Sequence, residues 1–441
     1  MITLRVGLIG LGTIGTGVAQ LLLSHRDLLQ QRLGKTVQLV RICDLDIKRD
    51  RGMDLSSVDL TTDASRITEA EDIDLVIELM GGLEPARSFM KTALQHGKHV
   101  VTANKALIAK HGEELFPLAA EKGLQIGFEA AVGGGIPCMK ALREGLAAND
   151  IQSIYGILNG TCNYILTKME TEGADFSEML AQAQALGYAE ADPTFDIEGI
   201  DTAHKLSILA AMAFGSKIKF EDIYTEGISR ITLADIASAH ELGYRIKLLG
   251  IAKPHGNGET RAIEMRVHPT LVPLDSQLAQ VSDSYNAVQI TGDFVGQTMF
   301  YGRGAGERPT ASAVVADIVD IASGFPEGVR HLAPPMGFVQ EARRDIPTLP
   351  MADVVSEYYL RLMVRDQPGV IASVTSILAD HHISLEAVLQ KERHATREVP
   401  VILLMHGTSE GNMQAAISRI LALDTVDGRH VLLLRKEEFG A

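Results

Sequence analysis

An aspartate and a lysine one helical turn apart are the side chains in this sequence best suited to acid–base chemistry. Asp201 and Lys205 are four positions apart, so on a helix they share one face and can form an ion pair. The residues that follow, 206–213, are almost wholly apolar and predict a buried helix. A lysine at the start of a buried helix needs a partner, and a partly desolvated lysine can act as acid or base near neutral pH.

The segment before this pair is rich in acidic side chains. Five carboxylates fall within 12 residues: Glu190, Asp192, Asp196, Glu198 and Asp201. Such a run most often reflects helix-end electrostatics, because Asp and Glu favour the first turn of a helix. The alternative is that part of the run lines a functional site. His204 lies beside the Asp201–Lys205 face, and we interpret it as a packing or capping residue.

A glycine-rich turn near the N-terminus has the context of a dinucleotide site. The apolar run 5–9 predicts a strand, Gly10, Gly12 and Gly15 follow it in a G-x-G-x-x-G pattern, and apolar residues from Val18 predict a helix. The glycines would give a tight turn, close approach of the backbone to a pyrophosphate, and helix–strand packing. The free N–H groups of the helix N-terminus would then face the anion.

The end of the second predicted strand, 37–42, bears on the choice between NAD and NADP. Asp44 stands where an acidic residue commonly binds the adenosine ribose hydroxyls, which favours NAD. Four basic residues crowd the same turn and suit a 2′-phosphate: Arg41, Lys48, Arg49 and Arg51. A solvated turn explains that cluster equally well. The preference stays open, with NADP slightly favoured.

Further strands at 74–79, 98–102 and 124–128 alternate with helical stretches, one of which begins near Pro85. This alternation predicts a parallel doubly wound sheet, in which ligands bind at the carboxyl ends of the strands. Lys105 and Glu129 both follow such ends. A lysine after a strand is usually a surface residue, but Lys105 falls where the nicotinamide half of a dinucleotide would lie.

Composition excludes several classes of protein. The chain has 441 residues, a length typical of about three domains. Its net charge is −15 and it has no basic block, so we expect no nucleic-acid or anionic-membrane binding. No apolar run is long enough to span a membrane. The cysteines, Cys43, Cys138 and Cys162, are scattered and lack metal-ligand spacing, which favours a reducing cytoplasm.

Three motifs in the middle of the chain resemble the signature of homoserine dehydrogenase: residues 158–161, 186–193 and 199–205. The Gly10–Gly15 turn, the segment 102–105 and the glycines of 302–306 also match that family in order. The resemblance covers about residues 1–345. It implies NAD(P)-dependent interconversion of L-homoserine and L-aspartate 4-semialdehyde, within threonine, methionine and isoleucine biosynthesis.

The resemblance also implies roles for individual residues. Lys205 is the expected proton donor and acceptor for the substrate oxygen, with Asp201 and Lys105 in support. Glu190, Asp196 and Asp201 are the expected substrate ligands, since carboxylates can hold the ammonium group of homoserine. The cofactor is expected to contact residues of the glycine turn and of two later segments: Gly10, Gly12, Thr13, Ile14, Gly15, Thr102, Lys105 and Gly306.

A monovalent cation, usually sodium, accompanies the substrate in this family. By resemblance, Glu129 gives a carboxylate oxygen, and backbone carbonyls come from Val132, Gly134 and Ile136. Oxygen ligands suit a hard cation, although the glycine run alone predicts only a flexible turn. We expect this ion to have a structural role. The family resemblance further implies a homodimer or homotetramer, with the dimer contact supplied by a mixed sheet predicted from strands near 261–267, 287–290 and 297–301.

The C-terminal part is predicted to be a separate domain. Five prolines between 324 and 351 indicate a linker. The pattern from Tyr358 to Leu434 is β-α-β-β-α-β, typical of a ferredoxin-like unit. Residues 365–370, before a helix, resemble the opening of an ACT domain, which implies feedback inhibition by L-threonine. A degenerate ACT domain that serves only dimerisation is the alternative.

The fold expected from these elements is α/β with three parts. A Rossmann-type NAD(P)-binding domain occupies 1–135, an α+β substrate and dimerisation domain 136–345, and a ferredoxin-like ACT domain 351–441. This division leaves room for the chain to return to the first domain near 302–325.

Two other functions are weaker candidates. Another amino-acid dehydrogenase, such as one acting on aspartate, would not need the block from Tyr188 to Lys205. A catalytically inactive NAD(P)-binding sensor would be expected to have lost Lys205 or Asp201, and both are present. From the length of 441 residues we expect no bifunctional fusion with aspartate kinase.

Overall fold

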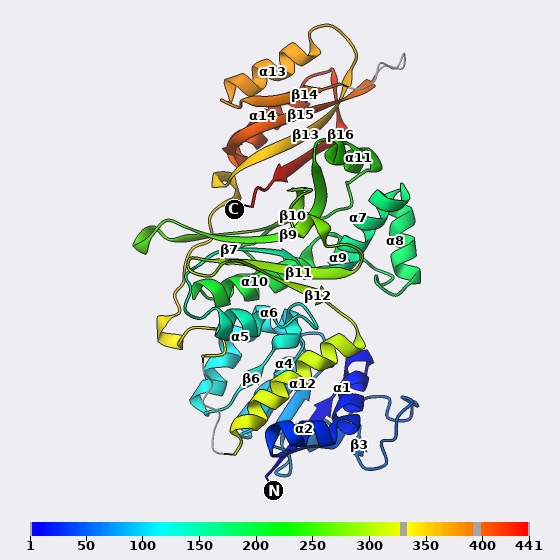
Figure 1. Ribbon diagram of the computed structural model, residues 1–441, viewed down its shortest axis with the longest axis vertical. Helices are drawn as coiled ribbons and strands as arrows, with labels where there is room; N and C mark the ends of the chain where they lie inside the picture. Colours follow the sequence, from blue (N-terminus) through cyan, green and yellow to red (C-terminus); the bar gives the residue numbers. More distant parts are fainter. Residues whose placement is uncertain (1, 327–332, 391–397, 440–441) are drawn as a thin grey trace. The chain divides into compact units, whose positions relative to one another are not determined.

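The computed structural model describes residues 2–326, 333–390 and 398–439. The chain forms two compact units (Figure 1). The first contains Met1–Gly160, Asp201–Ile223 and Ser284–Ile346, and the second contains Thr161–Ile200, Tyr224–Asp283 and Pro347–Ala441. Each unit is therefore built from segments that are distant in the sequence. The three-part division at 135/136 and 345/351 stays a prediction.

A parallel six-stranded sheet forms the centre of the first unit. Its strand order is β3-β2-β1-β4-β5-β6, the doubly wound arrangement that the alternating strands and helices predict. The strands are β1 Thr3–Ile9, β2 Thr36–Cys43, β3 Asp59–Thr61, β4 Leu75–Glu78, β5 His99–Thr102 and β6 Ile126–Gly127. The mixed α/β fold with a Rossmann-like sheet is thus confirmed.

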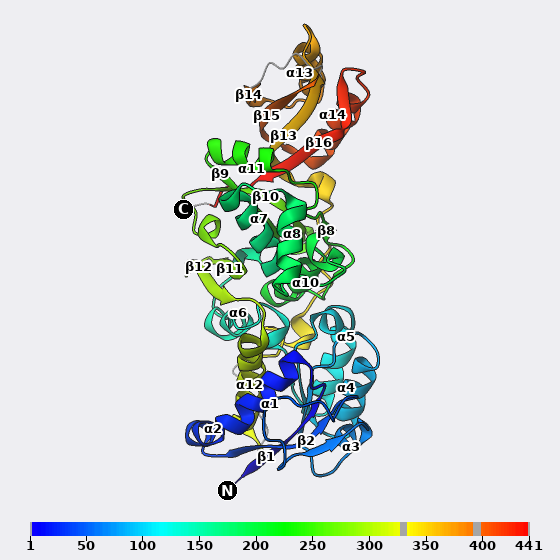
Figure 2. The ribbon, with the colours of Figure 1, turned by 90° about the vertical axis from the view of Figure 1, so that its right-hand side faces the viewer.

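Helices cover both faces of this sheet. Figure 2 shows α1, α2 and α12 on one face and α3, α4 and α5 on the other. Their bounds are α1 Thr13–Ser24, α2 Arg26–Leu33, α3 Ser65–Thr68, α4 Ala86–Gln95, α5 Lys105–Glu121 and α12 Glu307–Gly324. The last of them, α12, contacts α1, β5 and β6, although it follows β6 by nearly 180 residues in the sequence.

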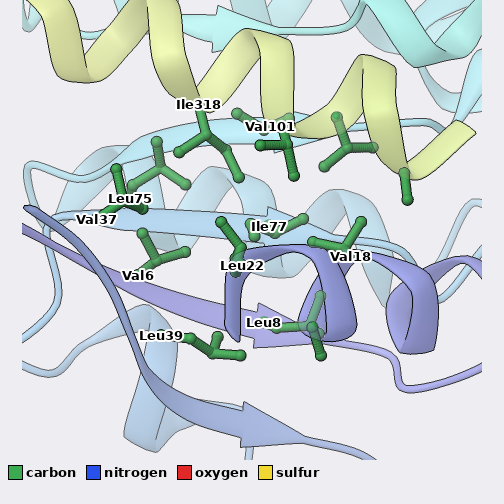
Figure 3. Packing of buried hydrophobic residues seen from close by; sticks show 14 of the residues in the cluster. Val6, Leu8, Val18, Leu22, Val37, Leu39, Leu75, Ile77, Val101 and Ile318 are labelled. Carbon is green, nitrogen blue, oxygen red and sulfur yellow. The ribbon is translucent and has the colours of Figure 1, made fainter. Parts of the chain in front are cut away.

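One apolar core joins the sheet to α1 and α12. Figure 3 shows Ile318 of α12 beside Val101 and above the side chains of the central strands. Val18 and Leu22 of α1 belong to the same buried cluster. Burial of such aliphatic side chains contributes roughly 1.5–3 kcal/mol each, which fixes both helices on the sheet.

The rest of the first unit carries a buried helix and three antiparallel strands. The strands are β7 Ile151–Ile157, β11 Tyr285–Gly292 and β12 Gly296–Arg303, with β11 paired to both others. Helix α10, Ile200–Phe214, is buried almost throughout, as its apolar sequence predicts. Helix α6, Cys138–Lys140, and a short π-helical turn, Ala141–Gly145, precede β7.

The second unit begins with helices and a long hairpin. The helices are α7 Gly160–Glu172, α8 Phe176–Ala185, α9 Thr194–Ile197 and α11 Leu233–Glu241. The strands are β8 Tyr224–Thr225, β9 Tyr244–His255 and β10 Ala262–Pro273, with β9 and β10 antiparallel and β8 parallel to β10. Helix α7 starts at Gly160, within the sequence motif 158–161.

Strand β10 is longer than the strand predicted at 261–267, and β9 and α11 were not predicted. In β10 three polar or charged side chains (Glu264, Arg266 and His268) alternate with apolar ones, and nearly every residue is buried. A strand buried on both faces lacks the contrast between an apolar and an exposed face that marks a strand in sequence.

The C-terminal part has the predicted β-α-β-β-α-β order. Its elements are β13 Val355–Arg365, α13 Val370–Asp380, β14 Leu385–Leu389, β15 Glu398–Ser409, α14 Glu410–Leu421 and β16 Val426–Lys436. The strand order β16-β13-β15-β14 is ferredoxin-like, and the part has its own apolar core. However, its edge strand β16 pairs with β10 at Thr270 and Arg435, so its sheet continues into the hairpin.

The proline-rich segment is only partly a linker. The backbone of Arg344 bonds to Gly215 and Lys217, and the backbone of Ile263 bonds to Pro347 and Leu349. Met336 is buried. Prolines end regular elements, but their neighbours still donate and accept hydrogen bonds, so much of this segment packs as irregular structure.

Candidate active site

The glycine-rich turn has the geometry that a dinucleotide requires. Gly10 has a φ of +97°, and a Cβ there would lie 2.7 Å from the backbone carbon of Leu79. A Cβ on Gly15 would lie 2.0 Å from the oxygen of Gly10, so helix and strand approach closely. Gly12 is exposed with open space before it, and it begins α1 without a side-chain cap. This arrangement leaves the helix N-terminus open to a pyrophosphate.

Two more residues of the turn have different exposures. Thr13 is exposed at the first position of α1, and Ile14 is half-buried against the core. Both therefore lie at the helix N-terminus where cofactor contacts are expected.

Asp44, after β2, is held in place by its neighbours. Its carboxylate accepts from the N–H of Leu11 at 2.6 Å and lies 3.5 Å from the guanidinium of Arg51. Arg51 in turn donates to the carbonyl oxygen of Leu11 at 3.0 Å. The acidic side chain is thus tied to the glycine turn itself, where it can meet a ribose.

The basic cluster beside Asp44 is smaller than the sequence suggests. Arg41 pairs with Asp59 at 2.6 Å and with Asp72 at 3.1 Å, so its guanidinium is engaged on the β3 side of the sheet. Lys48 and Arg49 are exposed in the turn. The expectation that Arg41 faces a 2′-phosphate is therefore not supported, because two carboxylates distant in sequence hold it.

Thr102, at the end of β5, is buried and internally bonded. Its hydroxyl donates to Glu78 at 2.7 Å and accepts from the N–H of Asn104 at 3.0 Å. The side chain of Asn104 caps α5 by accepting from the N–H of Leu107 at 3.1 Å. The Thr102 side chain thus organises the strand ends rather than presenting a hydroxyl to solvent. Glu78 was not singled out in the sequence, because a lone acid within an apolar strand carries no motif.

Lys105, Asp201 and Lys205 form one cluster. The ion pair that the spacing predicts is present, with Lys205 Nζ 2.7 Å from Asp201 Oδ2. Lys105 Nζ lies 2.8 Å from Asp201 Oδ1, so one carboxylate bridges two ammonium groups from α5 and α10. Lys205 also donates to the carbonyl oxygen of Leu158 at 2.6 Å, and Asn159 donates to Asp201 at 2.9 Å.

The two lysines of this cluster differ in exposure. The Lys105 side chain is 33% exposed, and the Lys205 side chain is 9% exposed. Burial raises the pKa of Asp201, but the ammonium groups of Lys205 and Lys105 outweigh burial and hold that pKa below its usual range. Asp201 therefore stays ionised and can orient a proton-donating lysine.

His204 packs rather than joining this cluster. Its ring stacks on Phe220 with centroids 3.9 Å apart and planes 5° apart. The packing role predicted for it is confirmed.

The other expected substrate residues belong to the second unit. Glu190 is exposed, and Asp196 of α9 is half-buried. The hydroxyl of Thr161 donates to the carbonyl oxygen of Tyr188 at 2.6 Å and lies 3.4 Å from Asp196 Oδ2. Cys162 Sγ lies 3.2 Å from the Asp196 carbonyl oxygen. The loop before α9 is thereby anchored on the start of α7, with both carboxylates at or near its surface.

Glu129, after β6, is a buried carboxylate. It accepts from the N–H groups of Met139 at 3.1 Å and Lys140 at 2.8 Å, while its own N–H donates to Asp317 at 2.8 Å. Burial, and then the nearby Asp317, raise the pKa of Glu129 to about 8. Two buried acids side by side form an electronegative site, which a cation would stabilise.

The glycine run after Glu129 allows a close approach between distant segments. Gly134 has a φ of +53°, and a Cβ there would lie 2.4 Å from the oxygen of Gly304. A Cβ on Gly135 would lie 2.8 Å from Pro309. Gly306 has a φ of +113° and begins α12 without a side-chain cap. The glycine run therefore packs closely against the segment before α12. It differs in this from the flexible turn that the sequence alone predicts.

The carbonyls of Val132 and Ile136 both lie next to Cys138. Cys138 Sγ is 3.7 Å from the Val132 oxygen, and the Cys138 N–H donates to the Ile136 oxygen at 2.7 Å. Each carbonyl has a second lone pair, so these contacts leave acceptor capacity for a hard cation. Within the described ranges, no three or more His, Cys, Asp and Glu side chains are placed to hold a metal ion. A cation here would rest mainly on backbone oxygens.

Comparison with known proteins identifies the family. Family models described as "Homoserine dehydrogenase, NAD binding domain", "Homoserine dehydrogenase" and "ACT domain" match residues 10–129, 137–319 and 358–424. A homoserine dehydrogenase of Neisseria gonorrhoeae is 45% identical over 433 residues, which is 98% of each chain. The chain belongs to the homoserine dehydrogenase family. It is accordingly an NAD(P)-dependent oxidoreductase of amino-acid biosynthesis with a C-terminal ACT domain.

Two further relatives agree with this assignment over the whole length. A homoserine dehydrogenase of Pseudomonas aeruginosa is 46% identical over 437 residues, 99% of each chain. The crystal structure of a homoserine dehydrogenase from Thiobacillus denitrificans has a TM-score of 0.93 at 50% identity, covering 99% of each chain. In the part of the chain that the structure describes, no helix is both long and apolar enough to cross a membrane.

Proposed function

We propose that Lys205 is the acid–base residue in the interconversion of L-homoserine and L-aspartate 4-semialdehyde. The observation that supports this role is the bridged cluster, in which Asp201 lies between Lys205 and Lys105. When bound, reduced NAD(P) supplies the hydride that goes to the aldehyde carbon. Lys205 gives the proton that the substrate oxygen then requires, and the alcohol forms.

Asp201 and Leu158 keep Lys205 oriented through this step. After proton loss the neutral amine still has two N–H donors, which Asp201 Oδ2 and the Leu158 oxygen can accept. In the reverse direction the same amine takes the proton from the homoserine hydroxyl. Lys105 is proposed to assist beside the nicotinamide, since it follows β5 and reaches the same carboxylate.

Glu190 and Asp196, with Asp201, are proposed to hold the ammonium group of the substrate. Asp196 Oδ2 lies 3.4 Å from the Thr161 hydroxyl oxygen, and Glu190 is exposed. Removing either carboxylate should raise KM for homoserine more than it lowers kcat, because it weakens binding rather than proton transfer.

The cofactor is proposed to lie along the turns at the carboxyl end of the parallel sheet. Gly10, Gly12, Thr13, Ile14 and Gly15 would hold the pyrophosphate, and Thr102, Lys105 and Gly306 would lie nearer the nicotinamide. NADP is slightly favoured over NAD, since Lys48 and Arg49 are exposed beside Asp44. Both proposals are tested by adding L-homoserine to the protein with NADP or with NAD and measuring the absorbance of the reduced cofactor. No homoserine-dependent reduction in folded protein would refute the activity.

A sodium ion is proposed to bind at Glu129 and the carbonyls of Val132, Gly134 and Ile136. Replacing sodium with choline should lower the midpoint of thermal unfolding by a few degrees, since ligand binding stabilises the folded state. Glu129→Gln should abolish this difference. An equal response to sodium in the variant would remove the carboxylate from the proposed site.

The ACT domain is proposed to bind L-threonine and to lower activity. Inhibition requires that threonine bind two states of the enzyme with different affinity. We also propose a homodimer or homotetramer, testable by light scattering. The three cysteines are buried free thiols, which supports a reducing cytoplasm as the proposed location.

A further inference from the structure

A carboxylate outside the proposed catalytic cluster joins two of the turns that line the cofactor edge. Glu78 is the last residue of β4, which lies between β1 and β5. In the register of the sheet it stands between Ile9 on β1 and Thr102 on β5. Its side chain is fully buried. A carboxylate buried at this edge is costly unless its oxygens are hydrogen-bonded.

Three donors converge on the Glu78 carboxylate. Oε1 accepts from the N–H groups of Met80 at 2.9 Å and Gly81 at 3.3 Å. Oε2 accepts from the Thr102 hydroxyl at 2.7 Å. An ionised carboxylate only accepts, so it fixes the direction of all three donors at once. Burial raises the pKa of Glu78, and the bonds from Thr102 and the backbone oppose that effect.

These bonds continue from Thr102 into the start of α5. Thr102 accepts from the N–H of Asn104, and the Asn104 amide donates to the oxygen of Gly82 at 2.7 Å. Asn104 also caps α5, whose first residue is Lys105. A ring of hydrogen bonds therefore joins the turn after β4 to the turn after β5. Lys105 directly follows Asn104, which belongs to that ring.

The ring also touches the glycine turn. The backbone at Leu79 and Met80 lies where a Cβ on Gly10 would be, and the N–H of Leu79 donates to the oxygen of Ile9 at 2.9 Å. Movement of the turn after β4 would thus disturb both the pyrophosphate turn and the start of α5. An apolar side chain at position 78 could fill the space but could not hold three donors.

We propose that Glu78 is a positioning residue for the dehydrogenase reaction, acting through Thr102 and Asn104 to set Lys105 against Asp201. This inference rests on the proposed role of Lys105. The Glu78 carboxylate accepts from Met80, Gly81 and Thr102, which lie between it and Lys105 or away from the reacting atoms, so its effect on catalysis is indirect. A displacement of about 1 Å at a reacting group can cost on the order of a hundredfold in rate, so a support of this kind matters for turnover.

Glu78→Gln and Thr102→Val are the variants that test the proposal. Gln keeps the volume but brings an amide N–H₂ among groups that are already donors. Val keeps the shape of Thr102 and removes its hydroxyl. Each should lower kcat about tenfold with less than about twofold change in KM for homoserine, since positioning acts on the transition state. Thr102→Ser, which restores the hydroxyl, should return kcat to near the wild-type value.

A matched control separates positioning from a general loss of stability. Thr68 is also a buried threonine of the first unit, and its hydroxyl donates to the oxygen of Ala64 at 3.3 Å. Thr68→Val should lower the unfolding temperature by a similar amount and leave kcat unchanged. Equal loss of kcat in Thr68→Val and Thr102→Val would overturn the proposal.

A double-mutant cycle with Lys105→Ala completes the test. If Glu78 acts through Lys105, Glu78→Gln should cost about tenfold in kcat with Lys105 present and less than about twofold without it. The same tenfold loss in both backgrounds would overturn the inference and leave the role of Lys105 intact. A Lys105→Ala variant with normal kcat would instead refute the proposed role of Lys105, and the inference with it.

Discussion

Two regions of the molecule bury charged side chains, and they do so with different chemistry. In the first unit, one aspartate bridges two lysines that come from two helices, α5 and α10. In the second unit, two arginines on adjacent strands are each enclosed by two glutamates: Arg266 by Glu264 and Glu437, and Arg435 by Glu226 and Glu410.

The arginine sites are closed, whereas the lysine site is open on one side. Arg266 and Arg435 are fully buried, and their guanidinium groups cannot lose a proton in a protein. The acids around them are held ionised, as the pKa of Glu264, lowered to about 2, illustrates. Lys105 is partly exposed, and an ammonium group can give up its proton. The comparison teaches that the enclosed arginines of the second unit suit structure, and that the bridged lysines of the first unit suit proton transfer.

The largest expected effect is the loss of turnover in Lys205→Ala. We expect kcat to fall at least about a thousandfold, since general acid–base catalysis contributes roughly 10²–10⁴-fold. Cofactor binding, measured by fluorescence titration, should be unchanged.

Lys247 offers a matched control for Lys205. It is buried in the second unit, its Nζ bonds to Asn163 at 2.9 Å and Val281 at 2.6 Å, and burial lowers its pKa to about 7. Lys247→Met should reduce stability and leave the kcat of the folded protein near normal. Near-normal kcat in Lys205→Ala, or a thousandfold loss in Lys247→Met, would break the distinction between the two regions.

The next effect is a loss of stability in Arg435→Met. Removing one partner from a buried ion pair typically costs about 3–5 kcal/mol, because the acids Glu226 and Glu410 are left uncompensated. Urea unfolding of the second unit measures this loss. The exposed Arg429, 3.0 Å from Asp427, gives the control, and Arg429→Ala should change stability by less than about 1 kcal/mol.

A smaller effect is expected in the pH dependence of stability. Burial raises the pKa of Glu264, but His255, Arg266 and Lys253 lower it to about 2, below its ordinary 4.5. Glu264 therefore stabilises the fold above about pH 4.5, and that contribution is lost as the pH falls towards 2. Thermal unfolding between pH 7 and pH 3 should show a steeper acid-side decline in wild type than in Glu264→Gln. Parallel curves would show that this carboxylate is not held ionised.

The smallest expected effect on basal activity is that of Gly369→Asp in the ACT domain. Gly369 has a φ of +93° before α13, and a Cβ there would meet no atom within 4 Å. The variant should fold, keep its kcat and lose inhibition by threonine. Gly34→Asp, at another open glycine with a φ of +65°, is the control for strain. Unchanged threonine sensitivity in Gly369→Asp would count against the proposed regulatory site.

Much of the fold could be predicted because its patterns are local. Five of the six parallel strands, the helix at Asp201–Lys205 and the β-α-β-β-α-β order follow from periodicity and from turn residues, whereas the short strand β3 was not predicted. Strand β9 and helix α11 were missed. The hairpin of β9 and β10 is buried on both faces, so its sequence lacks the contrast between an apolar and an exposed face that marks a strand.

The candidate site could be predicted where it depends on residue type and spacing. Asp201 and Lys205 were identified from their four-residue spacing, and the glycine turn from its pattern. Glu78 was missed because its significance comes from Thr102, which is distant in sequence. The suitability of Arg41 for a 2′-phosphate was overestimated for a related reason, since Asp59 and Asp72 pair with its guanidinium only in the folded chain.

By itself, the sequence determined most of the elements, the glycine-rich turn that opens a helix N-terminus, and the lysine that shares a helical face with an aspartate. Only the tertiary structure decided that Lys105 reaches the same carboxylate, that Glu78 holds two turns together, and that the glycine run after Glu129 makes room for the segment before α12. The physical reason is the range of the interactions. Helical spacing and turn geometry act over a few residues, whereas ion pairs and close backbone approaches join whatever the fold brings together.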